Sequence, residues 1–270
     1  KIYNTKKLVK DTDFRVSYSN NTNVGTAKVT LTGQGEYTGT ATSTFVITKV
    51  SENGITAKLS YTKTTHNGEQ KTPTVTVTTA SGKKLEIDKD YDVEFKESSR
   101  RYVGVYNVSV VLGGTNGNYT GTIPLKFAIV PKATSSVVTK LSTASNGYDN
   151  ISAAWDSVTG ASGYYFYYKK ASSSTWSKAI DCGTKRKHTT GNLSDGVKYN
   201  IKIVAYFKSG NDVYTAINSK QSSIYTLKKV TNVTLKKSTK TKVKVSWKNI
   251  NGETGYQIQK MKKVGSKYIS

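Results

Sequence analysis

The sequence predicts an all-β protein made of tandem antiparallel β-sandwich modules, arranged as an extended multi-domain rod. Three observations lead to this fold class. At 270 residues the chain exceeds the usual domain size of about 100–150 residues, so two or more cores are expected. Thr, Val, Tyr and Ser are abundant whereas Met occurs once and Pro three times, which favours strands. Finally, apolar and polar residues alternate within segments that recur along the chain.

A first pair of repeats occupies the N-terminal half. Residues 13–18 (DFRVSY) recur as residues 90–95 (DYDVEF). Because successive side chains of a strand point to opposite faces, we expect Phe14 and Val16 to face inward and Arg15 to face water. Further segments recur in the same order: 24–29 and 103–108, 37–40 and 119–122, and 45–47 and 127–129. Gly-rich and Asn-rich turns separate them, so we expect antiparallel hairpins.

A second pair of repeats occupies the C-terminal half. Trp155 recurs as Trp247, and Tyr164 recurs as Tyr256 at the same offset, each tyrosine directly after a glycine. Each Trp lies in an alternating segment and each Tyr begins the next segment after a short loop, which is the spacing of a β-sandwich. The residues expected in the cores are Trp155, Tyr164, Phe166, Leu193, Tyr199, Trp247 and Tyr256.

These motifs carry two resemblances. The Trp, the Gly-Tyr pair and residues 193–205 (LSDGVKYNIKIVA) resemble the fibronectin type III domain, in which Leu-x-x-Gly-x-x-Tyr forms a tyrosine corner. The motifs NVGTA (23–27), GEYTGT (35–40) and FVI (45–47) resemble the immunoglobulin-like tandem repeats of Gram-positive bacterial surface proteins. The resemblances imply spacers, adhesion modules or accessory domains, and neither family supplies catalytic residues. The Arg-Gly-Asp cell-attachment tripeptide is absent from the sequence.

The resemblances imply four modules. The second repeat has strand patterns at 55–61 and 73–77 for which the first repeat has almost no counterpart, so the first strands of the first module are expected to be missing. The last module is likewise expected to be only the first part of a sandwich. The expected modules are a partial immunoglobulin-like repeat (1–49), a complete one (50–132), a fibronectin type III domain (133–227) and the N-terminal part of a second (228–270).

Composition and charge exclude several classes of protein. No stretch approaches the roughly 18 consecutive apolar residues of a transmembrane segment. Cys182 is the single cysteine, so no internal disulfide can form. The net charge is +24 with its largest excess near the C-terminus, and only four of the 41 basic residues are arginine. Such lysine-rich surfaces are diffuse and solvated, so no specific nucleic-acid recognition is expected.

No catalytic residue, metal ligand or cofactor is expected. Cys182 and His188 could form a nucleophile pair, but Cys182 is expected to pack in a strand and His188 to lie in a basic turn. The acidic run around Asp90 resembles a calcium loop only superficially. Asp90 and Asp92 alternate with apolar residues on a predicted strand, and the first repeat has Arg15 in place of Asp92.

Two aromatic residues are the first candidate contacts. In the Tyr-rich segment after Gly163, Tyr165 and Tyr167 match Gln257 and Gln259 of the following module, so both are expected to face out of the sandwich. Together with Trp176 they could stack on a sugar chain or a partner surface. The alternative is that they pack across strands against lysine stems or against Trp176.

The C-terminal lysines are the second candidate contacts. Lys240, Lys242 and Lys244 alternate and are expected on one strand face, where they could neutralise a polyanion such as a wall polymer or an acidic glycan. The alternative is that they keep an exposed strand from pairing with other chains. The full set of candidates is Lys236, Lys237, Lys240, Lys242 and Lys244.

The function expected from the sequence is a non-catalytic structural spacer or adhesion segment of a larger bacterial cell-surface or secreted protein. The alternative is a set of carbohydrate-binding or cell-wall-binding accessory modules of a secreted multi-domain enzyme whose catalytic domain lies outside these residues. In either case we expect an extracellular monomer. Its partners would be host or bacterial surface glycans, anionic cell-wall polymers or surface proteins.

Overall fold

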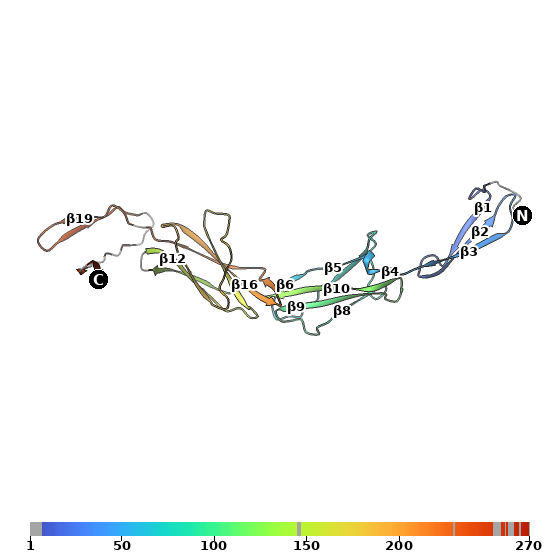
Figure 1. Cartoon of the computed structure of the whole chain (residues 1–270), viewed down its shortest axis with the longest axis horizontal. Helices are drawn as coiled ribbons and strands as arrows, with labels where there is room; N and C mark the ends of the chain where they lie inside the picture. Colours follow the sequence, from blue (N-terminus) through green and yellow to red (C-terminus); the bar gives the residue numbers. More distant parts are fainter. Residues whose placement is uncertain are drawn as a thin grey trace. The chain divides into compact units, whose positions relative to one another are not determined.

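The computed structural model describes residues 7–144, 147–228, 230–250, 255–256, 258, 262–264 and 266–269. Their secondary structure consists of strands and one 3₁₀ turn, η1 (Glu52–Gly54), and nearly all strand pairs are antiparallel (Figure 1). The predicted all-β class is therefore confirmed. Within the described ranges no helix is long and apolar enough to cross a membrane.

Contacts between residues divide the chain into two compact units. The first consists of Lys1–Ala133, Val158–Ser162 and Ala205–Asn218, and the second of Thr134–Ser157, Gly163–Val204 and Ser219–Ser270. The division into four modules stays a prediction.

In the first unit, the first repeat forms a single antiparallel sheet. Its strands are β1 (Phe14–Ser19), β2 (Gly25–Gly33) and β3 (Thr40–Ile47), in the order β1-β2-β3. The register pairs Val16 with Leu31 and Leu31 with Ala41, so apolar side chains share one face of the sheet.

The second repeat adds a second layer to the corresponding sheet. Strands β4, β10, β9 and β8 form a sheet in that order, β6 pairs with β10, and β5 pairs with β7 as a separate ribbon. The bounds are β4 (Val50–Ser51), β5 (Ile55–Leu59), β6 (Lys63–Thr65), β7 (Val75–Thr79), β8 (Tyr91–Phe95), β9 (Gly104–Leu112) and β10 (Tyr119–Val130). The core lies between the layers, where Ile55 and Val77 of the ribbon pack with Tyr91 and Val110 of the sheet.

The two repeats also share a turn ahead of their first common strand. The backbone N–H of Val9 donates to Asp13 Oδ2 at 2.8 Å, and that of Glu86 donates to Asp90 Oδ2 at 3.0 Å. Each turn has an aspartate with positive φ, namely Asp11 (66°) and Asp88 (64°). Aspartate tolerates this left-handed backbone better than most residues. The recurring acidic residues therefore build a turn.

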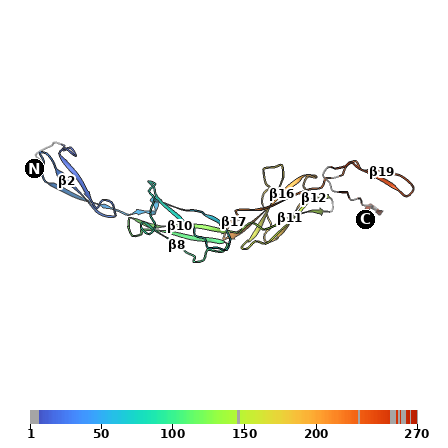
Figure 2. The same ribbon diagram turned by 180° about the vertical axis from the view of Figure 1, so that it is seen from behind.

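The second unit contains a two-sheet sandwich. One sheet has the order β11-β12-β15, and the other has β14-β13-β16 with β18 paired to β16. Figure 2 shows β11, β12 and β16 from behind. The bounds are β11 (Val137–Ala144), β12 (Gly147–Trp155), β13 (Gly163–Lys170), β14 (Ile180–Asp181), β15 (Lys187–Thr190), β16 (Lys198–Ser209) and β18 (Lys220–Tyr225). The end of β16 pairs with β17 (Asp212–Thr215) and belongs to the first unit. The buried residues include Trp155, Tyr164, Phe166, Leu193 and Tyr199.

The C-terminal part differs from the expectation in the burial of its two aromatic residues. Its strands are β19 (Thr234–Lys237), β20 (Val243–Ser246), β21 (Lys262–Val264) and β22 (Lys267–Ile269), which form two-stranded sheets. Trp247 and Tyr256 are half-buried rather than fully buried, and their rings pack edge to face 5.2 Å apart. A two-stranded sheet offers too little surface to enclose a tryptophan.

The prediction that Lys240, Lys242 and Lys244 share one strand face is wrong. Lys240 precedes β20 and lies in the turn of the β19–β20 hairpin. The backbone N–H groups of Ser238 and Thr239 donate to the carbonyl oxygen of Lys242, which closes that turn. Turn formation after β19 therefore overrides the alternation that the sequence suggests.

Candidate functional site

Strand β13 separates its aromatic residues between the two faces of its sheet. Tyr164 and Phe166 are buried in the core, whereas Tyr165 and Tyr167 lie half-buried on the opposite, outer face. On β16 the same alternation buries Tyr199 and Ile201. The side chains of Asn200 and Lys202, which alternate with these buried residues, therefore join the outer face.

An aromatic–lysine cluster, formed by Tyr165, Tyr167, Lys169, Trp176 and Lys202, covers this outer face. The Lys202 Nζ lies 4.6 Å from the ring centroid of Tyr167 and 4.5 Å from that of Trp176. The Lys169 Nζ lies 5.2 Å from the Trp176 centroid. The Tyr165 and Tyr167 rings meet edge to face at 6.4 Å. Each lysine thus lies within the range of a cation–π contact.

The loop after β13 holds Trp176 in place. Lys169 Nζ donates to the carbonyl oxygen of Ser173 at 2.7 Å. The backbone N–H of Ser177 donates to the carbonyl of Tyr168 at 2.9 Å, and the N–H of Tyr168 donates to Ser177 Oγ at 3.1 Å. These bonds fold the loop back on its own strand, so that Trp176 reaches Lys202 of β16.

The cluster changes the electrostatics of its members. Burial lowers the pKa of Lys202, and the neighbouring charge of Lys169 lowers it further. Burial also raises the pKa of Tyr167, with a smaller contribution from Tyr165. The cluster therefore carries lysines that are partly withdrawn from water on a face that the sequence predicts to be exposed.

This geometry favours packing over ligand stacking. Lys202 already occupies ring surface of both Tyr167 and Trp176, so these rings are less accessible to a sugar chain. Sequence reasoning considered lysine stems as partners but did not identify Lys202. The signal available was its position, since Lys198, Asn200 and Lys202 alternate with the buried residues of β16.

The Cys182 and His188 side chains have shifts opposite to those of an activated pair. Burial raises the pKa of the Cys182 thiol, and burial lowers the pKa of His188. A thiolate–imidazolium pair requires the reverse directions. His188 lies in β15 rather than in the expected turn, because its segment pairs with β12. Its ring lies 4.7 Å from that of Phe166.

The acidic run has a structural explanation. Asp90 is buried, and its Oδ1 accepts a hydrogen bond from Asn116 Nδ2 at 2.9 Å while Oδ2 accepts from Glu86. Asp90 lies in the turn before β8 rather than on the expected strand, whereas Asp92 lies on β8 and is exposed. In the described ranges no group of three or more His, Cys, Asp or Glu side chains could hold a metal ion.

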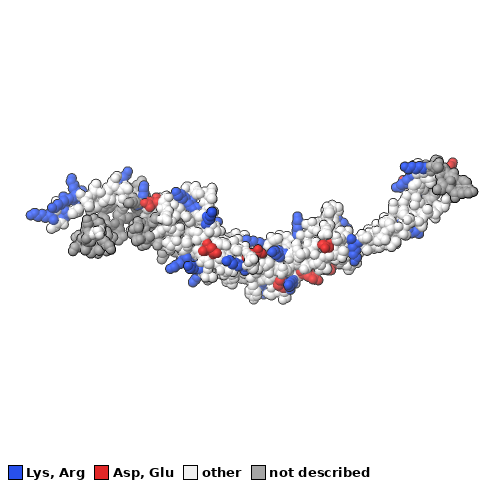
Figure 3. Space-filling model, viewed as in Figure 1, with Lys and Arg blue, Asp and Glu red and all other residues white. Residues whose placement is uncertain are grey.

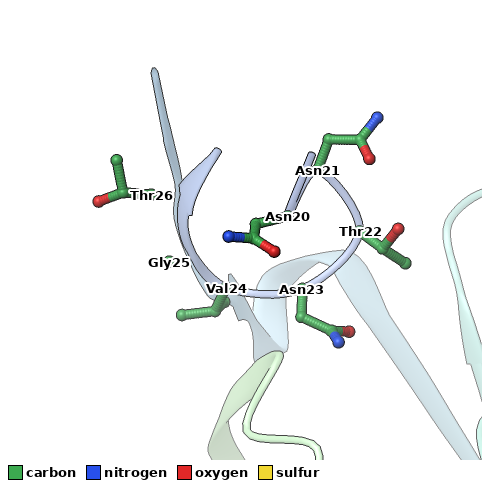
Figure 4. Close-up of a pocket in the computed structure, with 7 residues that line it drawn as sticks. All are labelled: Asn20, Asn21, Thr22, Asn23, Val24, Gly25 and Thr26. Atoms are coloured by element: carbon green, nitrogen blue, oxygen red, sulfur yellow. The ribbon is translucent and has the colours of Figure 1, made fainter. Parts of the chain in front are cut away.

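The loop between β1 and β2 lines one hollow on the surface. Residues 20–26 line a polar hollow of about 460 Å³, and Figure 4 shows their side chains radiating away from the loop apart from Asn20, which points inward. The loop carries amides, hydroxyls, a valine and a glycine, and no titratable group. It therefore offers no general acid, general base or nucleophile.

The β19–β20 hairpin is uniformly basic. Lys236 lies directly opposite Lys244 in the register, and both are exposed. Figure 3 shows basic side chains along this hairpin, and residues 230–250 contain no Asp or Glu. Like charges directly across a strand pair repel each other. The described lysines of this hairpin are Lys236, Lys237, Lys240, Lys242 and Lys244.

Comparisons with known proteins give structural likenesses only. No family model and no curated protein matches the chain. It is similar to the FN1–FN3 domains of chicken CNTN1 (16% identity, 75% of this chain and 78% of that chain covered, TM-score 0.34). It is also similar to a segment of two fibronectin type III domains of chicken tenascin (15% identity, 80% of this chain and 98% of that chain covered, TM-score 0.34). A third similar structure is that of titin domains A168–A170 (10% identity, 82% of this chain and 85% of that chain covered, TM-score 0.30). Likenesses of this size leave the family open, and the fold rests on the strand pairing described above.

Proposed function

We propose that the chain is a non-catalytic segment of tandem β-sandwich modules that serves as a structural spacer or adhesion segment of a bacterial cell-surface or secreted protein. The observation that carries this proposal is that the polar and aromatic side chains considered as candidate site residues make contacts within the fold. Asp90 builds a turn, His188 packs against Phe166, and Lys202 packs on two rings. These groups stabilise the fold instead of facing a common cavity.

A second candidate function is polyanion binding by the β19–β20 hairpin. Lys236 and Lys244 repel each other across the hairpin, and no carboxylate of residues 230–250 relieves the repulsion. An anionic wall polymer or acidic glycan would relieve it. This candidate corresponds to an accessory module of a secreted enzyme rather than to a pure spacer.

Single-molecule stretching of the chain tests the spacer function. Modules that fold independently unfold one at a time, so residues 50–132 and 133–227 should unfold in separate events. At roughly 3.6 Å per residue these events release about 300 Å and about 340 Å of chain, less the length of each folded module. A single event that spans both segments would contradict the proposal. The proposal would also be contradicted if the purified chain hydrolysed a glycan or peptide substrate and the Cys182→Ser or His188→Gln variant did not.

Retention on immobilised heparin or wall teichoic acid separates the second candidate from the first. A K236Q/K244Q variant should elute at clearly lower salt than the unmodified chain, because screened attraction by these lysines supplies the retention. A K28Q/K58Q variant, with exposed lysines removed elsewhere, is the matched control. Equal shifts for both variants would indicate net charge alone and would remove the case for a site.

A further inference from the structure

The sheet of β1, β2 and β3 has one apolar face and one polar face. Pairing places Tyr18 opposite Val29 and Ala27 opposite Phe45, so these side chains share the apolar face. The other face carries mainly Thr, Ser and Lys. The large side chains of the apolar face include Phe14, Val16, Tyr18, Leu31, Phe45 and Ile47.

This apolar face remains open to solvent. Tyr18 is 58% exposed and Phe45 is 42% exposed, whereas Val29 and Leu31 are half-buried. Figures 1 and 2 show β1, β2 and β3 as one layer of strands in the described part of this repeat. A contiguous apolar face of this kind is typical of an interaction surface in a soluble protein.

The second repeat shows which element covers the same face. Tyr106 pairs with Phe127 as Ala27 pairs with Phe45, so Phe127 is the counterpart of Phe45. Yet Phe127 is only 1% exposed. The difference comes from the β5–β7 ribbon and the residues that follow β5.

The covering contacts on Phe127 are specific. The Tyr61 ring meets the Phe127 ring edge to face at 5.9 Å, and Leu59 and Val75 pack on the same cluster. Leu59 pairs directly with Val75 across the ribbon, so both point to the sheet. The cover is thus a two-stranded ribbon with aliphatic side chains at alternate positions, packed face to face on the sheet.

We propose that the apolar face of the β1–β2–β3 sheet binds a two-stranded β-ribbon of the β5–β7 type. The occupant is another segment of repeat-type sequence, and not a second copy of the same three-stranded sheet. The reason is that the β8–β9–β10 sheet of the second repeat has the same strand order, register and apolar face, and the β5–β7 ribbon covers it. The surface goes beyond the spacer and polyanion functions and does not depend on either.

Titration of the 270-residue chain with a synthetic peptide of residues 51–85 tests the assignment. Methyl NMR should show saturable shifts of Leu31 and Ile47 on the apolar face. Val46, which is 70% exposed on the polar face, should not shift. A peptide with Ile55 and Val77 both replaced by Asp should not bind, because it loses the apolar side of the ribbon.

Adjacent residues on opposite faces provide matched variants. Phe45→Lys should weaken peptide binding by at least about tenfold, which corresponds to roughly 1.4 kcal/mol. Val46→Lys should leave the affinity within about twofold. Phe45→Thr keeps a residue that favours strands and should also weaken binding, so the result does not depend on how well the sheet tolerates a lysine.

Three results would overturn the proposal. One is the absence of saturable shifts on the apolar face at millimolar peptide. Another is a set of shifts confined to the second repeat, which would mean that the peptide displaces the existing ribbon. The last is concentration-dependent self-association of the unmodified chain that Phe45→Lys abolishes, because the occupant would then be a second copy.

Discussion

The phenolic oxygen of Tyr199 accepts a hydrogen bond from the backbone N–H of Ser194 at 3.0 Å. Tyr199 is buried at the start of β16, and Ser194 precedes it in the connection from the other sheet. The bond ties this connection to the strand that follows. It is the geometry that the resemblance to a tyrosine corner implies for residues 193–199.

Replacing Tyr199 with Phe should therefore lower the free energy of unfolding by about 1–2 kcal/mol, because a part-buried N–H loses its acceptor while the ring is kept. Chemical denaturation measures the change. Tyr225→Phe is the control, since Tyr225 is exposed, and it should change stability by less than about 0.5 kcal/mol. Equal effects for the two variants would contradict a structural role for the Tyr199 hydroxyl.

Asp90 should make stability depend on pH. Burial raises the pKa of its carboxyl group, but hydrogen bonds from Glu86 and Asn116 and nearby lysines lower it more, so the net pKa lies below the ordinary value. Its stabilisation is present above the unfolded pKa of about 3.9 and is lost as the pH falls through the lower folded pKa. Asp90→Asn should lower the free energy of unfolding by about 1–2 kcal/mol at neutral pH. It should also flatten the acid limb, that is, the fall of the free energy of unfolding as the pH is lowered.

Asp92→Asn is the matched control for Asp90, because Asp92 is close in sequence and exposed on β8. It should keep both the stability and the acid limb of the unmodified chain. An acid limb that survives in Asp90→Asn but disappears in Asp92→Asn would show that the wrong carboxylate has been assigned.

His188 should make the second unit less stable in mild acid. Burial lowers its pKa, so the unfolded chain binds a proton more readily than the folded chain. The contribution to stability is present above the unfolded pKa of about 6.5 and is lost as the pH falls through the folded pKa. His188→Phe should remove this part of the slope, as measured by denaturation between about pH 7 and pH 5. An unchanged slope would contradict the assignment.

Neighbouring arginines should differ sharply in their contribution to stability. Arg100 is 8% exposed, donates to the carbonyl oxygens of Lys71 and Glu97, and lies 4.2 Å over the Phe95 ring centroid. Arg100→Met should cost about 2 kcal/mol or more, because it leaves carbonyl groups without a donor. Arg101→Met, at an exposed position, should cost less than about 0.5 kcal/mol. Thermal denaturation of both variants measures the difference, and similar losses would contradict it.

The aromatic–lysine cluster should respond as packing. Tyr167→Gln should lower the free energy of unfolding by about 1 kcal/mol and move the pKa of Lys202 back toward its usual range, because the ring that shields Lys202 is gone. Carbon NMR of the lysine side chain reports the titration. Tyr225→Gln is the control, since it also removes a tyrosine ring next to a lysine, Lys198 at 5.6 Å, but that ring is exposed. A glycan that binds more weakly to Tyr167→Gln at unchanged stability would instead support a ligand-stacking role.

The sequence alone determined the local structure of this protein. Alternation placed Tyr164 and Phe166 on one face of a strand and Tyr165 and Tyr167 on the other, because side chains of a strand alternate whatever surrounds them. The repeated motifs likewise predicted matching strands in the two N-terminal repeats, and the described strands β1 and β8 agree with them.

Only the tertiary structure decided which side chains meet and which are covered. Lys202 reaches Tyr167 and Trp176 because a loop folds back across two strands, and no spacing in the sequence encodes that fold. Phe45 and Phe127 occupy matching positions in the two repeats, yet one is exposed and the other is buried. Burial depends on what packs against a face, and for Phe127 the covering ribbon comes from residues more than forty positions earlier in the chain.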